Sequence, residues 1–213
     1  MNANHPAIPV PYVDAAQRAR AGQLGMWTFL ATEVLFFGGL ITSYVVMRVT
    51  YPAAFAAGSR HLSFAIGTTN TLVLLTSSLT MVWAVALAGA ARRRAAIACL
   101  VATGILGALF LALKSSEYHD KFVEHLVPGN AFRLPAGDPP ALQIFLFLYF
   151  ALTGLHALHM LVGIALVGWM VVRLGRTPAP PPDNAPELVG LYWHFVDCVW
   201  VFLYPLLYLV TPS

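Results

Sequence analysis

The sequence predicts an all-α integral membrane protein, a bundle of five transmembrane helices. Its hydrophobic content, its lack of charge and five long apolar runs predict this fold. Of 213 residues, 59% are hydrophobic and only 10% are charged, whereas an ordinary soluble domain is about 45–50% apolar and about 25% charged. Twelve Lys and Arg and nine Asp and Glu are too few to cover a soluble domain of this length. The composition therefore excludes a soluble enzyme, a nucleic-acid-binding protein and a disordered protein.

The first three helices are predicted from runs long enough to cross a bilayer. A hydrocarbon core about 30 Å thick needs roughly 20 apolar residues of helix. The run predicting a helix at about 24–48 contains one charge, Glu33, and the run predicting a helix at about 63–90 contains none. The third run is uncharged and just long enough, and it predicts a helix at about 95–115.

The last two helices are predicted at about 142–174 and 188–211. The fourth run is too short for two spans and has no internal proline, so we expect one long helix that tilts or projects beyond the lipid. The fifth run is interrupted only by Asp197. The chain thus divides into an N-terminal tail, residues 1–23, and a five-helix transmembrane domain, residues 24–213.

Basic residues predict the orientation of the bundle. An odd number of spans places the termini on opposite sides, and the N-terminus, the second loop and the fourth loop then share one side. Seven arginines lie on that side: Arg18, Arg20, Arg92, Arg93, Arg94, Arg173 and Arg176. The opposite side carries fewer basic residues, which are diluted by acidic ones. The positive-inside rule therefore predicts a cytoplasmic N-terminus.

Polar residues inside the predicted spans are the candidate functional residues. A lone ionised carboxylate at the bilayer centre costs about 2.5–3.5 kcal/mol even on the lenient insertion scale, so Glu33 and Asp197 need partners. His156 and His159 are three residues apart on one helix face, and His194 and Asp197 have the same spacing. We expect Glu33 to pair with His156 or His159 between helices.

Each candidate has both a functional interpretation and a purely structural one. His156 and His159 could ligate a metal or haem, but a single His-x-x-His is weak evidence, and hydrogen bonding between helices is the favoured interpretation. Glu33 is either a proton-relay group or a protonated, hydrogen-bonded core residue. Outside the spans, four residues near 119–125 favour a solvated face over a site: His119, Asp120, Glu124 and His125. Cys99 and Cys198 lie in apolar runs, which favours core packing.

Five segments, in order, resemble subunit III of the haem–copper terminal oxidases. They are Gly25–Phe37, which contains Glu33; Asn70-Thr71 with Ser77-Ser78; Ser116-Glu117-Tyr118; Thr153–His159 with Gly163; and Trp193–Trp200, with Glu187 seven residues before His194. The last is the most specific, and the resemblance covers about residues 23–211. It implies a five-helix form of a fold that has seven helices in many relatives.

The resemblance implies a non-catalytic subunit of an oxidase that passes electrons from cytochrome c to oxygen and translocates protons. Such a chain would carry no metal or other redox centre, with haem and copper in partner subunits. It would contact subunit I directly, beside subunit II, other subunits and membrane lipids, in a bacterial-type inner membrane. There it would stabilise subunit I and support proton uptake.

The resemblance also marks residues for particular roles. A buried polar or proton-linked cluster would be formed by Glu33, His156, His159, His194, Asp197 and Glu187. Arg173 would either bind the phosphate of a phospholipid or serve as an interfacial anchor. Lys114 replaces a glutamine that is common in the family, and we expect it to reach the membrane surface.

Three alternatives stay open on the sequence. The first is subunit III of a quinol oxidase or a homologue associated with nitric-oxide reductase, because such a bundle does not reveal the electron donor. The second is a small membrane transporter, although the chain has no inverted repeat and no paired broken helices. The third is a metal-dependent membrane enzyme, which predicts stoichiometric iron or copper in the purified chain.

Overall fold

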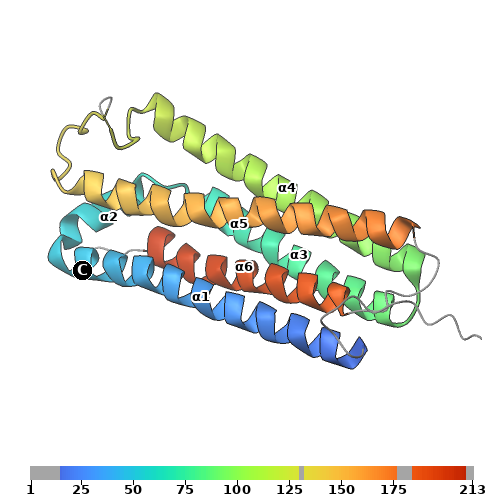
Figure 1. Cartoon of the computed structure of the whole chain (residues 1–213). Helices are drawn as coiled ribbons and strands as arrows, with labels where there is room; N and C mark the ends of the chain where they lie inside the picture. The colour runs from blue at the N-terminus through green and yellow to red at the C-terminus, as the bar shows by residue number, and fades with distance from the viewer. Residues whose placement is uncertain (1–14, 130–131, 177–183, 210–213) are drawn as a thin grey trace, which may run out of the picture.

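The structure, a computed structural model, describes residues 15–129, 132–176 and 184–209, and these form six helices (Figure 1). The helices are α1 (Ala15–Thr50), α2 (Pro52–Arg60), α3 (Phe64–Gly89), α4 (Arg93–Val123), α5 (Leu142–Arg176) and α6 (Ala185–Tyr208). All except α2 are long and apolar enough to cross a membrane. The protein is therefore a helical, multi-pass membrane protein, as the sequence predicts.

The five long helices lie side by side, with α1 at one edge of the bundle (Figure 1). Helices α3, α4, α5 and α6 form a closed group in which each helix packs against two of the others. Helix α1 packs against α5 and α6 but not against α3 or α4. Much of α1 consequently faces outward, and large apolar side chains such as Leu24 and Leu35 are exposed there.

Two helix boundaries differ by more than three residues from the predicted ones. Helix α1 begins at Ala15, so residues 15–23 of the predicted tail are helical; this stretch is rich in Ala, Arg and Gln, which favour helix. Helix α4 continues to Val123, beyond the predicted end at 115. The end predicted for the last helix, residue 211, lies outside the described residues.

A short helix, α2, was not predicted from the sequence. It follows α1 after the single residue Tyr51, with Pro52 at its first position, where proline's fixed φ suits a helix start. Its nine residues are too few to span lipid, and the apolar-run criterion therefore missed it. Phe55 of α2 is buried and packs edge-on against Phe145 of α5, with ring centroids 5.4 Å apart.

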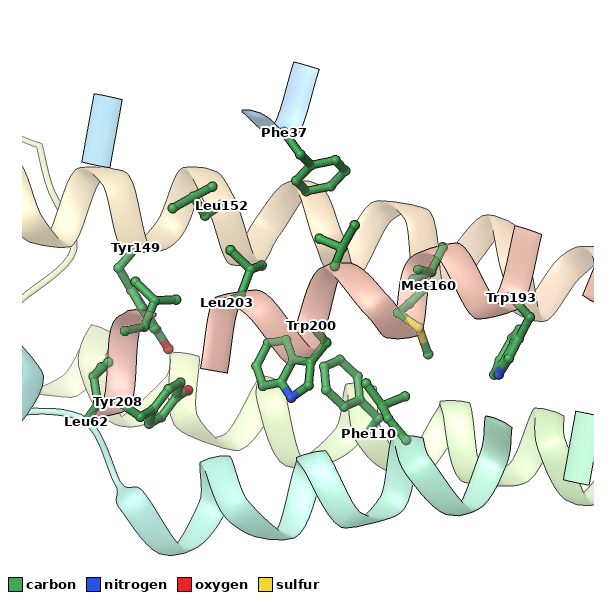
Figure 2. Close-up of a cluster of buried hydrophobic side chains, with 14 of the residues drawn as sticks. Phe37, Leu62, Phe110, Tyr149, Leu152, Met160, Trp193, Trp200, Leu203 and Tyr208 are labelled. Carbon is green, nitrogen blue, oxygen red and sulfur yellow. The ribbon is translucent and has the colours of Figure 1, made fainter. Parts of the chain in front are cut away.

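The core is aromatic and closely packed (Figure 2). Trp200 of α6 meets Phe110 of α4 edge-on, with centroids 4.8 Å apart. Trp193 lies against two glycines: a Cβ at Gly107 would come within 2.7 Å of its ring, and one at Gly163 within 3.2 Å. Gly107 needs to be glycine because the indole ring occupies the space of a side chain, whereas a Cβ at Gly163 would require the ring to move by a few tenths of an ångström.

Candidate functional site

One predicted pair forms at the edge of the bundle. Glu33 of α1 lies between helices, with Oε2 3.1 Å from Nε2 of His159 on α5. The ring of Phe37 covers the imidazole at 5.3 Å, and the Tyr192 hydroxyl donates to the His159 carbonyl at 3.0 Å. The Glu33 side chain keeps 17% of its exposure, because α1 has no second layer of helices outside it.

His156 is not the partner of Glu33. It is fully buried in the centre of the bundle, between Phe110 at 5.4 Å and Trp200 at 5.1 Å, ring to ring. Three residues turn a helix by roughly 300°, so side chains at this spacing point about 60° apart. His159 therefore points at α1, whereas His156 points inward. Neither His156 nitrogen has a hydrogen-bond partner among the described residues.

The second predicted pair, on α6, is joined through a serine of α3. Ser78 Oγ lies 2.8 Å from Nδ1 of His194, and Ser78 is also a polar neighbour of the Asp197 carboxyl. Asp197 is buried, with no hydrogen bond of normal geometry to its carboxyl oxygens within the described ranges. Asn70 of α3 is a further buried side chain whose polar atoms lack such a partner.

The densest polar cluster contains a lysine that was wrongly expected at the membrane surface. Lys114 is only 2% exposed and donates to Glu117 at 2.8 Å, to the Tyr149 hydroxyl at 2.9 Å and to the Tyr208 hydroxyl at 2.6 Å. Tyr208 in turn donates to Glu117 Oε2 at 2.7 Å. The ammonium also lies 4.6 Å from the Tyr149 ring centroid and 5.3 Å from that of Trp200. We call Lys114, Glu117, Tyr149 and Tyr208 the Lys114 cluster.

The Lys114 cluster joins three helices, α4, α5 and α6, near the end where α5 begins. Sequence analysis missed it because the apolar run stops at Leu113, which suggests that the next residue lies in the interface. A usable signal was present, since Lys114 and Glu117 are three residues apart and share a helix face. The four side chains of the cluster hydrogen-bond to one another, and these bonds offset the free-energy cost of burying the charges of Lys114 and Glu117.

A polar pocket of about 610 Å³ lies beside this cluster, with Glu117 in its wall. His119, Asp120 and Glu124 also line this pocket, and Glu124 pairs with Lys121 at 2.6 Å. These residues belong to the last turns and the cap of α4 and not to a loop.

The remaining candidates lie at the opposite end, which carries the arginines. Glu187 is in the first turn of α6 and is exposed, far along the helix from Asp197. Arg173 lies over the Trp169 ring at 5.2 Å in the last turn of α5. Arg93 donates to the carbonyl of Gly175, which brings the start of α4 to the end of α5. The predicted cluster of six is thus dispersed over four places: the Glu33–His159 pair, His156 in the core, His194 and Asp197 beside Ser78, and Glu187 at the start of α6.

The histidines, cysteines and carboxylates in the part of the chain that the structure describes are scattered over the bundle. No group of three or more His, Cys, Asp or Glu side chains there is arranged to hold a metal ion. His156 and His159 point into different surroundings, so the His-x-x-His spacing does not create a shared ligand pair. Of the two, His159 forms the predicted hydrogen bond between helices, to Glu33, whereas His156 forms none with the described residues.

Comparison with known proteins gives the family. A family model described as cytochrome c oxidase subunit III matches residues 15–211. The chain is similar to cytochrome c oxidase subunit 3 of Thermostichus vulcanus, with 31% identity over 88% of this chain and 87% of the relative. It is also similar to cytochrome bo(3) ubiquinol oxidase subunit 3 of Pseudomonas putida, with 29% identity over 88% and 84%.

A third relative is a longer chain. Heme-copper oxidase subunit I+III of Aeropyrum pernix is 30% identical over 87% of this chain and 22% of its own length. All three relatives are named for oxidases, and the matching family model spans every transmembrane helix described above. The chain therefore belongs to the cytochrome c oxidase subunit III family of the haem–copper oxidases.

Proposed function

We propose that this chain is the non-catalytic subunit III of a proton-translocating haem–copper terminal oxidase. In this role it binds subunit I directly, stabilises it, and supports proton uptake from the cytoplasmic side. The observation that carries the proposal is the Glu33–His159 pair, an acid and an imidazole 3.1 Å apart, with Glu33 midway along α1. The pair lies on the edge helix, where a neighbouring subunit would find it.

Association with subunit I is supported by one relative. The Aeropyrum pernix chain is named as a fusion of subunits I and III, and a fusion requires the two parts to be compatible in one membrane complex. Partly exposed α1 supplies an apolar surface large enough for helix-to-helix contact. Haem and copper belong, in this proposal, to the partner subunits, and this chain supplies packing and protonatable groups.

Cytochrome c is the proposed electron donor, with quinol as the second candidate. The specific observation for quinol is the similarity to a ubiquinol oxidase subunit 3 at nearly the same identity as to a cytochrome c oxidase subunit 3. The donor would bind elsewhere in the complex, so similarity in this chain does not separate the two.

Orientation and lipid contact complete the proposal. The arginine-rich end, which carries Arg92–Arg94 and Arg173, would face the cytoplasm. There the Arg173 guanidinium, held over Trp169, would bind a phospholipid phosphate.

The first experiment is purification of the tagged full chain from native membranes in mild detergent. We expect a complex with a haem spectrum and oxygen consumption with reduced cytochrome c. Oxygen consumption with quinol alone would establish the second candidate. A chain that leaves the membrane without an oxidase would contradict the proposal.

The second experiment tests the pair itself in the intact oxidase. Glu33→Gln removes the carboxylate but keeps a polar side chain, and we expect slower proton uptake and a shorter turnover lifetime with assembly preserved. Glu124→Gln, a matched change at an exposed position, should leave all three unchanged. Identical behaviour of the two variants would remove the assigned role of Glu33.

A further inference from the structure

An apolar groove of about 650 Å³ lies on the outer surface of the bundle, between α1 and α6. Its α1 wall includes Trp27, Ala31 and Leu35, and its α6 wall includes His194, Phe195 and Cys198. This volume is within the range of small-molecule sites in proteins. Of the lining residues, Trp27 carries an indole N–H that can only donate, and His194 carries a ring nitrogen that can donate or accept.

His194 has one nitrogen committed and one available. Its Nδ1 lies 2.8 Å from Ser78 Oγ, which fixes the ring's orientation. Its Nε2 makes no hydrogen bond with any described residue and is not among the enclosed polar atoms. A polar nitrogen that faces hydrocarbon loses its hydrogen bond to water without replacement, which costs free energy.

The depth of His194 decides which ligands can reach it. It lies nine residues from the start of α6 and fourteen from its end, or about 14 Å and about 21 Å along the helix. Phospholipid headgroups lie outside a hydrocarbon core about 30 Å thick. Their phosphates therefore do not reach this nitrogen, and a fatty-acid carboxylate would be costly at that depth.

From this geometry we propose that the α1–α6 groove binds a lipid-soluble quinone or quinol, with a ring oxygen hydrogen-bonded to Nε2 of His194. A quinone ring is neutral, carries oxygens that accept or donate hydrogen bonds, and has an apolar tail that enters the bilayer core. Trp27 and Phe195 offer aromatic surfaces for the ring. The proposal concerns binding only, and it does not rest on the electron donor proposed above.

Both redox forms fit the same imidazole. A quinone carbonyl accepts a hydrogen bond from Nε2–H, in which case Ser78 donates to Nδ1. A quinol hydroxyl donates to an unprotonated Nε2, in which case Nδ1–H donates to Ser78. The serine hydroxyl serves either tautomer, because it both donates and accepts.

The test is photolabelling of the full chain in its native complex, embedded in membranes depleted of endogenous quinone. The probe is a short-tailed ubiquinone carrying a photoreactive azide, and labelled peptides are identified by mass spectrometry. We expect label on the α1 and α6 segments that line the groove. A tenfold excess of decylubiquinone should reduce it at least fivefold, and the same mass of phosphatidylglycerol should not.

Three variants make the test specific. Ala31→Phe fills the groove from an exposed position, so labelling should fall at least fivefold; Ala98→Phe, an equal change at an exposed position on α4, should not alter it. His194→Leu should abolish competition by decylubiquinone, and His194→Gln, which keeps a hydrogen-bonding group, should restore part of it.

Two outcomes would overturn the proposal. Equal competition by phosphatidylglycerol would make the groove a general lipid contact. Labelling that is unchanged in Ala31→Phe would place the probe elsewhere. Assembly of each variant, followed by the haem spectrum of the complex, separates loss of binding from loss of folding.

Discussion

The Lys114 cluster and the Glu33–His159 pair are both ion-pairing groups inside a membrane bundle, but their surroundings differ. Lys114 and Glu117 are each 2% exposed, and their hydrogen bonds link α4 to α5 and α6. Among the described residues, Glu33 has one hydrogen-bond partner, and its side chain is 17% exposed. The enclosed cluster ties three helices of one chain together, whereas the edge pair is left where another protein can contact it.

The difference follows from the packing of the two regions. Helices α3 to α6 surround one another, so a charge between them must be satisfied internally. Helix α1 has neighbours on one side only, and a polar group there can be completed by a partner subunit. The comparison predicts that damage to the first site acts on folding and damage to the second acts on the assembled oxidase.

The largest effect is expected from Lys114→Leu. The change leaves the Glu117 carboxylate buried without its cation, which costs about 3–5 kcal/mol of unfolding free energy. Denaturant titration of the purified chain in mixed micelles would measure the loss. The double variant Lys114→Leu/Glu117→Leu should recover most of it, because no buried charge remains. A double variant as unstable as the single one would show that the ion pair is not the cause.

A smaller loss is expected from Tyr208→Phe. The hydroxyl accepts a hydrogen bond from Lys114 and donates one to Glu117. Its removal leaves a buried donor and a buried acceptor with one hydrogen bond fewer each, which should lower the free energy of unfolding by about 1–3 kcal/mol. The same titration would measure it. Tyr204→Phe is the matched control, since its hydroxyl bonds to a partly exposed threonine, Thr68, at 2.7 Å. Equal losses in the two variants would contradict the special role of the cluster.

Glu33→Gln should destabilise the isolated chain by only about 0.5–1.5 kcal/mol, the value of one hydrogen bond. An amide can still bond to His159, which limits the loss. Thermal release of this chain from the oxidase would distinguish the two sites. Glu33→Gln should accelerate release, whereas Tyr208→Phe should lower the stability of the chain itself before it changes release. The reverse order would overturn the distinction between the two sites.

The smallest effect is expected from Glu124→Gln. Its partner Lys121 is 2.6 Å away, but the Glu124 side chain is 50% exposed, and pairs of this kind contribute about 0–1 kcal/mol. Raising the salt concentration should reduce even this contribution, because exposed charges are screened. A loss comparable to that of Lys114→Leu would mean that exposure does not govern the strength of these pairs.

Much of the fold could be predicted from the sequence, and less of the site. The long α5 was predicted as one helix because no proline interrupts it, and the resemblance gave the family. The choice between His156 and His159 could not be predicted, because their spacing permits either to face Glu33. Lys114 was misplaced for a related reason: a lysine next to an apolar run is compatible with both the interface and the interior.

The sequence by itself determined that this chain is a five-span membrane protein of the subunit III family, since composition, run length and ordered motifs are properties of the chain. Only the tertiary structure decided which polar groups meet: Glu33 with His159, Lys114 with Glu117, and His194 with Ser78. The physical reason is that lipid and core are both apolar, so a membrane helix carries little hydrophobic pattern to mark its inner face. The rotation of each helix about its axis then depends on packing against its neighbours.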